Sequence, residues 1–264
     1  MRVVSLAPSN TEIIFALGAE KSLVAVTAFC DFPADAKKLP RLPGWSTIKA
    51  QDVLAHKPDL ALTSSICQAE LKSELEAAGV RVIHFDPRSL SQVSESFIQI
   101  AKLLGVDGSK HSAEFSSDIQ KLIQSRPAKR PRIYIEEWDK PPMAAGNWVP
   151  ELIQVAGGEP FNRELGIPSA TLSWEELMEF DPEIVVYSIC GLATRFDPAA
   201  FLMVEGWRDL SAAKAGRVYS VDDSLFNRPG PRLVEGGRLL RSLIEEYAGA
   251  ATIVQNDCLR RLAS

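Results

Sequence analysis

The stretch Asp52-Val-Leu-Ala-His-Lys-Pro-Asp-Leu-Ala-Leu-Thr-Ser-Ser-Ile-Cys67 returns in altered form as Glu176-Leu-Met-Glu-Phe-Asp-Pro-Glu-Ile-Val-Val-Tyr-Ser-Ile-Cys190. Each copy has a short helical pattern, a proline that ends it, an apolar run of strand length and a loop with a cysteine. The chain therefore consists of two related halves. In parallel α/β sheets ligands bind beyond the carboxyl ends of the strands, so two facing lobes would bring Cys67 and Cys190 toward one cleft. The duplication thus predicts a ligand site.

The composition is that of a folded globular protein, with 46% hydrophobic and 24% charged residues among 264. The net charge is -5, and no long Lys/Arg block is present, which argues against a nucleic-acid partner. No apolar run approaches the roughly 20 residues that span a bilayer. The sequence as written carries no signal peptide and predicts a cytoplasmic monomer; a periplasmic location is the alternative if an export signal has been removed.

Apolar runs and helical periodicities alternate along the chain, which indicates mainly parallel sheets. The patterns predict strands at 2–6, 22–29, 81–85, 132–136 and 217–221, and helices at 68–78, 91–104, 149–156 and 232–247. A long polar helix at 109–125 connects the halves, and one or two helical turns are expected after Gly249. We predict two Rossmann-like α/β lobes with an interlobe ligand cleft, joined by a single long helix. The predicted limits are an N-terminal lobe at 1–107, a connecting helix at 108–128 and a C-terminal lobe at 129–264.

Two places have the spacing of a capping box, in which a serine side chain and a glutamate three residues later satisfy the free N–H groups of a helix start. They are Ser9 with Glu12, and Ser173 with Glu176. We therefore expect one helix to begin after Ser9 and another after Ser173.

Aromatic and thiol side chains follow several predicted strands. Trp45 lies in a Pro/Gly-rich loop and Trp138 follows a strand, so either ring could hold a flat apolar ligand, with loop packing as the alternative. The cysteines Cys30, Cys67 and Cys190 could ligate a soft or borderline metal as thiolates. Equally, a free cysteine is commonly a small buried hydrophobe, and no C-x-x-C spacing supports a preformed zinc site.

The acidic pair Glu136-Glu137 could act as an acid/base device, but neighbouring strand residues point to opposite faces, so at most one faces the cleft. The chain contains no G-x-S-x-G, P-loop or G-x-G-x-x-G motif. A catalytic site is therefore not expected.

Several stretches resemble the helical-backbone class (class III) of ABC-transporter substrate-binding proteins, most closely its cobalamin-binding branch. They are Val3-Val-Ser-Leu-Ala-Pro-Ser-Asn-Thr-Glu12, Cys30-Asp-Phe-Pro33, Lys57-Pro-Asp-Leu60, Pro141-Pro142 and Gly157-Gly-Glu159. The resemblance spans residues 2 to 247. It implies a non-enzymatic protein that binds a metal chelate, which in this family is cobalamin, haem or a ferric siderophore.

Carried over residue by residue, the family's ligand contacts fall on Pro8, Ser9, Asn10, Phe29, Trp45, Ser64, Glu137, Trp138 and Met143. Ser64 stands where a relative has an aromatic residue, while Glu137 and Trp138 replace an aromatic and a small residue. A more acidic cleft and a different chelate are therefore possible. The resemblance also implies docking to an ABC permease through one acidic residue on each lobe; Glu175 matches the second position, and the first falls on Gln51, which is not acidic.

Two functions follow from these patterns. The first is a substrate-binding protein that holds a cobalamin-like chelate for ABC-type uptake and has no cofactor of its own. The second is a cytoplasmic metal-handling protein or enzyme on the same scaffold, using Cys30, Cys67, Cys190 and Glu137. A third possibility is a partner-binding module whose cleft is vestigial. Replacing the cysteines with serine separates the first two, because ligand retention should change little under the first and collapse under the second.

Overall fold

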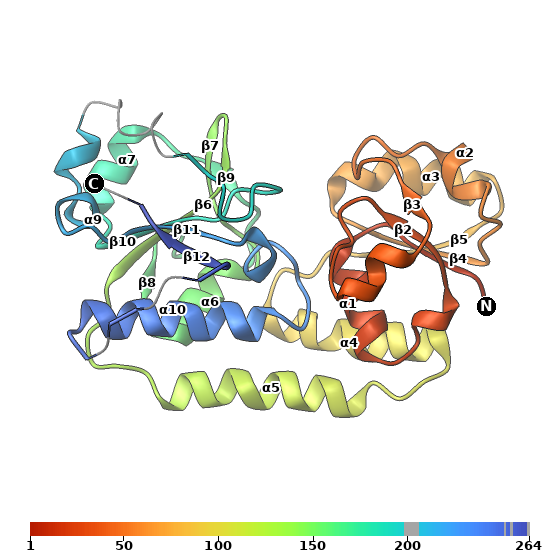
Figure 1. Cartoon of the computed structure of the whole chain (residues 1–264), viewed down its shortest axis with the longest axis horizontal. Coiled ribbons are helices and arrows are strands. Elements are labelled where there is room, and N and C mark those ends of the chain that lie inside the picture. Colours follow the sequence, from red (N-terminus) through yellow and green to blue (C-terminus); the bar gives the residue numbers. More distant parts are fainter. Residues whose placement is uncertain (198–205, 251, 254–255, 263–264) are drawn as a thin grey trace. The chain divides into compact units, whose positions relative to one another are not determined.

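The computed structural model of the chain describes residues 1–197, 206–250, 252–253 and 256–262. The chain divides into two compact units. Unit 1 comprises Met1–Pro87 and Ser91–Ser116, and unit 2 comprises Arg88–Leu90 and Ser117–Ser264. Each unit has one β-sheet with helices on both faces (Figure 1). The predicted class of two α/β lobes is thereby confirmed, whereas the predicted lobe limits and the shared cleft stay predictions.

Unit 1 is built on a five-stranded sheet of order β3-β2-β1-β4-β5, in which all neighbouring strands are parallel. The strands are β1 (Val3–Ser5), β2 (Leu23–Thr27), β3 (Arg41–Leu42), β4 (Leu60–Ser64) and β5 (Arg81–Phe85). The helices are α1 (Pro8–Ala16), α2 (Ala50–Leu54), α3 (Ala69–Ala77) and α4 (Leu90–Leu104), with 3-10 turns η1 (Glu20–Ser22), η2 (Ala34–Lys38) and η3 (Ile66–Gln68). Helix α5 (Ser109–Gln124) begins in unit 1 and ends in unit 2.

Parallel strands are buried on both faces, which explains why β1 and β4 read as apolar runs. Helices α2 and α3 cover one face of the sheet, and α1 and α4 lie on the other (Figure 1). Val53 of α2 and Leu71 and Leu75 of α3 pack against Val4 and Ala61 of the central strands. Because the connections alternate strand and helix, every carboxyl end of the sheet lies at the same edge.

Unit 2 has a mixed sheet of order β12-β11-β10-β6-β7-β9, with β8 paired to β6. Strands β6, β10 and β11 are parallel, while β7, β9 and β12 run antiparallel to their neighbours. The strands are β6 (Arg132–Asp139), β7 (Pro142–Ala144), β8 (Glu159–Pro160), β9 (Ala170–Thr171), β10 (Ile184–Tyr187), β11 (Val218–Val221) and β12 (Leu259–Arg261). The helices are α6 (Val149–Ala156), α7 (Trp174–Phe180), α9 (Ser211–Lys214) and α10 (Leu233–Tyr247), with turns η4 (Trp207–Asp209) and η5 (Asp223–Leu225).

The internal repeat is visible in the structure as one arginine clamp in each unit. In unit 1 the Nε of Arg2 donates to the carbonyl oxygen of Lys57 at 3.0 Å, and its backbone N–H donates to Asp59 Oδ2 at 2.7 Å. In unit 2 the equivalent bonds are 2.8 and 3.0 Å long and run from Arg132 to the carbonyl of Asp181 and the carboxylate of Glu183. The duplicated Pro-Asp/Glu segment directly precedes β4 in unit 1 and β10 in unit 2. In each unit the arginine therefore ties this segment to the start of the neighbouring strand, β1 or β6.

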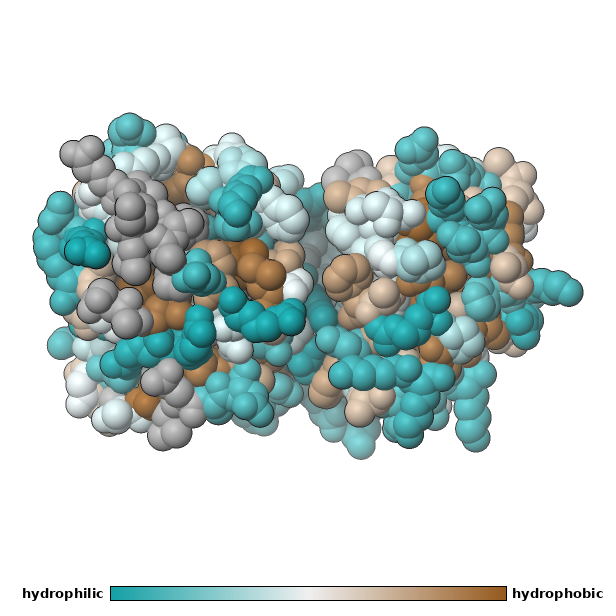
Figure 2. Space-filling view, turned by 45° about the horizontal axis from the view of Figure 1, so that its top comes forward, coloured by the Kyte–Doolittle hydropathy of each residue, from teal (hydrophilic) through white to brown (hydrophobic). Residues whose placement is uncertain are grey.

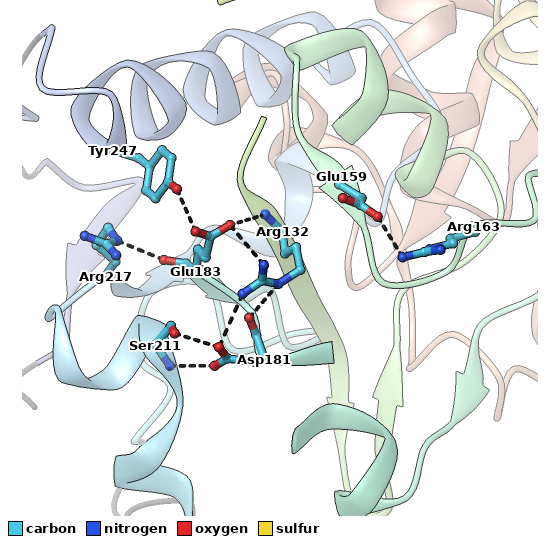
Figure 3. A network of polar contacts seen from close by, with 8 residues as sticks. All are labelled: Arg132, Glu159, Arg163, Asp181, Glu183, Ser211, Arg217 and Tyr247. Carbon is cyan, nitrogen blue, oxygen red and sulfur yellow. Dashed lines mark hydrogen bonds and ion pairs between the residues drawn. The ribbon is translucent and has the colours of Figure 1, made fainter. Parts of the chain in front are cut away.

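The clamp of unit 2 belongs to a wider polar network (Figure 3). The carboxylate of Asp181 accepts from the backbone N–H and hydroxyl of Ser211, both at 2.7 Å. Glu183 accepts from the hydroxyl of Tyr247 at 2.6 Å, and its carbonyl accepts from Arg217 at 2.9 Å. These bonds join α9, α10, β10 and β11 at the amino ends of the parallel strands, which is the edge opposite the expected ligand site.

The predicted capping box at Ser9 and Glu12 is wrong. Helix α1 begins at Pro8, its N-cap is Ala7, and no side chain caps it. Proline at the first helical position has its backbone angle preset and needs no hydrogen-bond acceptor, because it has no N–H, so the helix starts two positions earlier than expected. The second capping box is confirmed, since Ser173 and Glu176 exchange both bonds at the start of α7.

Two other local predictions differ from the structure. Strand β6 extends to Asp139 rather than ending at residue 136, because its polar end pairs with β7 in a hairpin. In the tail, the described residues form the antiparallel strand β12 on β11 instead of the expected helical turns; residues 251, 254–255 and 263–264 lie outside the described part. In both places pairing with another strand overrides the local pattern: the adjacent strand β7 for the end of β6, and the distant strand β11 for the tail.

None of the helices in the described part of the chain is both long and apolar enough to cross a bilayer.

Candidate functional site

The loop after β1 places Pro8, Ser9 and Asn10 at the start of α1. Pro8 is half-buried, but the side chains of Ser9 and Asn10 are buried. Asn10 donates its side-chain amide to the carbonyl of Thr63 at 3.3 Å. Asn10 thus ties α1 to strand β4 of the sheet, Ser9 is buried, and Pro8 is the accessible member of the predicted trio.

The predicted aromatic residues of unit 1 lie on loops at the carboxyl ends of its strands. Phe29 follows β2 and is 46% exposed, which is high for a phenylalanine in a rigid fold. Trp45 is half-buried, and its indole nitrogen is buried with no hydrogen-bond partner among the described residues. Ser64 ends β4 and is half-buried. The structure therefore places these three predicted residues on the carboxyl-end loops of one sheet.

A buried glutamine that the sequence did not point to organises these loops. The side-chain amide of Gln68 donates to the carbonyl of Leu6 at 2.7 Å and reaches the carbonyl of Trp45 at 3.4 Å, while its oxygen accepts from the backbone N–H of Ser64 at 2.9 Å. Gln68 is fully buried. Polar residues at the start of a helix commonly lie at the surface, so the local sequence gives no sign that Gln68 is buried.

Replacing Gln68 with leucine should destabilise unit 1 by about 2 to 4 kcal/mol, because the N–H of Ser64 and the carbonyl of Leu6 would lose their partner in the interior. Urea unfolding followed by Trp45 fluorescence measures this, since Trp45 is the one tryptophan of unit 1. The exposed neighbour variant Glu70→Leu is the control and should change stability by less than about 0.5 kcal/mol. Equal stability of both variants would show that Gln68 does not organise the loops.

The three predicted cysteine ligands have different surroundings. Cys30 is 0% exposed, and its sulfur accepts from the hydroxyl of Thr11 at 3.1 Å and lies 3.2 Å from that of Thr27. It matches the alternative of a small buried residue. Cys67 in unit 1 and Cys190 in unit 2 are exposed. Among the described residues no group of three or more His, Cys, Asp or Glu side chains could hold a metal ion.

An open pocket of about 380 Å³ lies in unit 1 at the start of α2 and α3. Its lining includes Lys49, Gln51, Cys67, Glu70 and Glu74, so it brings together two residues that the sequence singled out for different roles. Most of its lining groups are polar. The pocket therefore suits an ionic partner better than the apolar face of a chelate.

The hairpin of β6 and β7 carries the predicted residues of unit 2. Trp138 is 45% exposed and pairs across the hairpin with Met143. The indole N–H of Trp138 donates to the carbonyl of Lys140 at 3.0 Å, which fixes the ring orientation. Glu137 is half-buried; burial raises its pKa, and a hydrogen bond from Ser169 opposes this. One rigid hairpin thus presents an aromatic ring, a thioether and a carboxyl group.

Glu136 points away from Glu137 and into the core of unit 2, where it is 1% exposed. Tyr134 donates its hydroxyl to Oε2 at 2.8 Å, and Oε1 has no hydrogen-bond partner among the described residues. Desolvation raises the pKa of Glu136 to about 8, and the charge of Asp139 adds to this. The raised pKa favours the protonated form of Glu136 at pH 7, and its burial away from Glu137 means that the two carboxyls do not form an acid/base pair.

Cys190 begins a loop that two further residues hold in place. Asn227 donates its amide to the carbonyl of Ser188 at 2.7 Å and to the sulfur of Cys190 at 3.1 Å. Asp223 accepts from the backbone N–H groups of Gly191 and Ala193 at 3.1 and 3.0 Å. The residue is exposed as a whole, but desolvation of its sulfur and the charge of Glu137 raise the pKa of Cys190 to about 12. A thiol that stays protonated is a poor metal ligand.

The predicted docking residues are both at the surface. Gln51 lies in the first turn of α2 and Glu175 in the first turn of α7, and both side chains are exposed. Figure 2 shows one face of the molecule, on which apolar residues of both units lie exposed among hydrophilic ones. The structure thus leaves Gln51 and Glu175 accessible to a protein partner.

Comparison with known proteins gives consistent matches along the chain. A family model described as "Periplasmic binding protein" matches residues 3–225. A vitamin B12-binding protein from Yersinia pestis (strain Pestoides F) is 28% identical over 240 residues, which are 88% of this chain and 82% of that protein. A periplasmic haem-binding protein from Roseiflexus sp. RS-1 is 26% identical, with a TM-score of 0.80 over 95% of this chain and 99% of that one.

A periplasmic haem-binding protein from Pseudomonas aeruginosa has a TM-score of 0.82 over 98% of this chain and 96% of that one; at 24% identity it shows the fold alone. The family model covers most of the chain, and its members are binding proteins without catalytic activity. The chain therefore belongs to the periplasmic binding protein family, with the two α/β units of its class III members.

Proposed function

We propose that this protein binds a cobalamin-like metal chelate at the carboxyl ends of its strands and delivers it to an ABC permease. The observation that carries the proposal is the exposure of aromatic rings at these strand ends, Phe29 in unit 1 and Trp138 in unit 2. Aromatic side chains exposed at strand ends offer flat apolar surfaces on which a macrocyclic ligand can stack. The cleft shared by the two lobes remains part of the proposal.

The relatives support a chelate and leave its identity open. The curated relative binds vitamin B12 and the structural relatives bind haem, according to their names. We favour a corrinoid because the matching loop positions Pro8, Phe29 and Trp45 are those of the cobalamin-binding branch. Haem is the second candidate, supported by the Roseiflexus protein at 26% identity.

The proposed periplasmic location and the proposed permease partner both rest on the family to which the chain belongs. The family is described as periplasmic, which favours the periplasmic alternative over the cytoplasmic one. Exposed Glu175 on α7 would contact the permease, with Gln51 on α2 as the second contact. The metal-handling alternative is weakened because Cys30 is buried and the thiol of Cys190 stays protonated.

The experiment that tests this proposal is the visible spectrum of the purified protein after incubation with aquocobalamin and desalting. We expect a retained, roughly equimolar corrin spectrum. Parallel incubation with haemin decides between the two leading chelates. A shifted corrin spectrum that is lost in Cys67→Ser and Cys190→Ser variants would show a thiolate ligand and move the assignment to the metal-handling alternative. A protein that stays colourless after incubation with aquocobalamin and with haemin would exclude both the corrinoid and haem as its ligand.

Replacing Trp138 with alanine should weaken chelate binding by about tenfold, because a ring that stacks on the ligand contributes roughly 0.5 to 1.5 kcal/mol beyond its buried area. The measurement is a titration followed by the absorption of the ligand. Trp148→Phe is the matched control: Trp148 is buried and donates to the carbonyl of Phe226 at 2.7 Å, so its replacement should lower stability and leave affinity unchanged. Unchanged affinity in Trp138→Ala, with weaker binding in Trp148→Phe, would contradict a ligand role for Trp138.

A further inference from the structure

Glu136 belongs to a buried polar row that crosses the sheet of unit 2. The register pairs Glu136 of β6 with Tyr187 of β10, and Tyr187 with Ser220 of β11. Side chains that pair laterally on parallel strands point to the same face of the sheet, so these three lie together on one face. All three are buried, and Oγ of Ser220 has no hydrogen-bond partner among the described residues. An ionisable carboxyl group thus lies in the interior of the sheet.

The strands around Glu136 do not supply a positive charge to it. On its own strand, Tyr134 donates its hydroxyl to Oε2 at 2.8 Å, and the charge of Asp139 acts on the carboxyl group. The neighbouring strands place the phenol of Tyr187 and the methyl group of Ala144 beside it. Burial raises the pKa of both tyrosines, so they stay protonated up to pH 9. A carboxylate at this position would face hydroxyl groups and a second acid.

The elements that cover this face are apolar toward the sheet and keep their charges at the surface. The core cluster around Tyr134 and Tyr187 includes Leu177 of α7, Ala212 of α9 and Trp207 of η4. The charged residues of these elements and of the loop around Phe196 are exposed: Glu175, Glu176, Glu179, Arg195, Asp197, Arg208, Asp209 and Lys214. An ionised Glu136 therefore has no counter-ion among the described residues.

Glu136 also lies at the base of the hairpin of β6 and β7. The pairing of these strands shifts register between Glu136 and Trp138, so Glu137 is an extra residue without a partner on β7, as in a β-bulge. A bulge interrupts the ladder of backbone hydrogen bonds. Beyond it β7 pairs through Met143 and Pro142, and proline has no N–H to donate. The hairpin can therefore open locally while the parallel strands stay paired.

We propose that Glu136 and the hairpin of β6 and β7 form a proton-linked latch, in which loss of the proton from Glu136 favours local opening of the hairpin at the bulge. Opening lets water reach the carboxylate, which lowers the cost of its charge. In the closed state burial raises the pKa of Glu136 from 4.5 to about 8. The closed hairpin thus binds more protons than the open one, and its stability falls as the pH rises between these two values.

Hydrogen exchange of the ligand-free protein, followed by mass spectrometry on residues 137–145, tests the latch. Dividing the exchange rate of the wild type by that of Glu136→Gln at each pH removes the intrinsic pH dependence of exchange. We expect this ratio to rise about 30-fold or more between pH 6 and pH 9, because opening of the wild-type hairpin releases a proton. The amides of β10 and β11 should exchange more slowly than the hairpin, since they open only when the whole unit unfolds.

Glu179→Gln is the matched control, because it removes an exposed carboxylate from α7, and it should exchange like the wild type at every pH. If glutamine at position 136 disturbs folding, Tyr134→Phe gives a second test. The hydrogen bond from Tyr134 lowers the pKa of Glu136 against the effect of burial. Its loss should move the pH at which hairpin opening levels off to a higher value, whereas a merely structural role would change the rate equally at every pH.

Three results would overturn the latch. A ratio that stays constant between pH 6 and pH 9 would mean that the hairpin opens without exposing Glu136. One common exchange rate for the hairpin and for β10 and β11 would assign the pH dependence to unfolding of the whole unit. An unchanged levelling pH in Tyr134→Phe would remove Glu136 as the titrating group. These results leave the proposed function standing, because no ligand is present; that proposal fails instead when neither aquocobalamin nor haemin is retained.

Discussion

Replacing Glu136 with glutamine should make unit 2 about 3 to 5 kcal/mol more stable relative to wild type at pH 8 than at pH 4. In the wild type the carboxyl group is buried, one oxygen has no hydrogen-bond partner among the described residues, and desolvation raises its pKa from 4.5 to about 8. Glutamine has almost the same shape, can still accept from Tyr134, and never ionises. It therefore removes the cost of burying a charge without leaving a cavity.

The sign of the pH dependence follows from the raised pKa. Between pH 4.5 and 8 the folded chain keeps the proton of Glu136 while the unfolded chain releases it, so the folded state binds more protons. The stability of the wild type therefore falls as the pH rises through this window and levels off above pH 8. In Glu136→Gln this component of the pH dependence is absent.

Chemical unfolding at several pH values between 4 and 9 measures this effect, with the fluorescence of the unit 2 tryptophans as the signal. The control is Glu179→Gln, which removes an exposed carboxylate from α7 and should leave the pH dependence unchanged. Parallel stability curves for the wild type and Glu136→Gln would show that Glu136 is ionised in the folded protein.

Replacing Arg241 with methionine should destabilise unit 2 by about 3 to 5 kcal/mol. Arg241 of α10 is buried, and its guanidinium donates to the carbonyls of Leu122 at 2.6 Å and Ala156 at 2.8 Å and to the carbonyl and hydroxyl of Ser125. These carbonyls lie at or just beyond the ends of α5 and α6, where helices leave acceptors unpaired. Methionine fills much of the space but leaves those acceptors buried without donors.

Urea unfolding monitored by circular dichroism measures the change in Arg241→Met. Arg238→Met is the matched control on the same helix: Arg238 is exposed and its guanidinium bonds only to Asp118 among the contacts described, at 2.8 Å, so the loss of that side chain should cost less than about 1 kcal/mol. Arg241→Lys should recover part of the loss, because an ammonium reaches some but not all of the carbonyls. Similar stability of the two methionine variants would refute the role given to Arg241.

Local patterns predicted most of the fold. The repeated proline-acid unit, the strand at 81–85 and the helix at 149–156 occur as expected, because apolar periodicity and helix-ending residues act within a few positions of the chain. The failures have two causes. Helix α1 begins where Pro8 presets the backbone angle, whereas the polar end of β6 and strand β12 form because they pair with another strand, β7 and β11 respectively.

The positions of the candidate site residues were predictable in part, whereas their binding role stays a prediction. The sequence and the family resemblance pointed to Phe29, Trp45 and Trp138, and these do lie on loops or strand ends at the carboxyl edge of the sheets. They could not show that Gln68 holds three loops together, since its partners lie up to 62 positions away.

By itself the sequence determined the two α/β units, their internal duplication and the family, because each rests on short-range patterns that survive in any environment. Only the tertiary structure decided the roles of the chemically active groups. Cys30, Glu136 and Glu137 are ordinary side chains in sequence, and burial makes the first a small interior residue, the second an acid that favours its protonated form at pH 7 and the third a half-buried carboxyl group. Desolvation depends on every atom packed around a group, and that packing comes from distant parts of the chain.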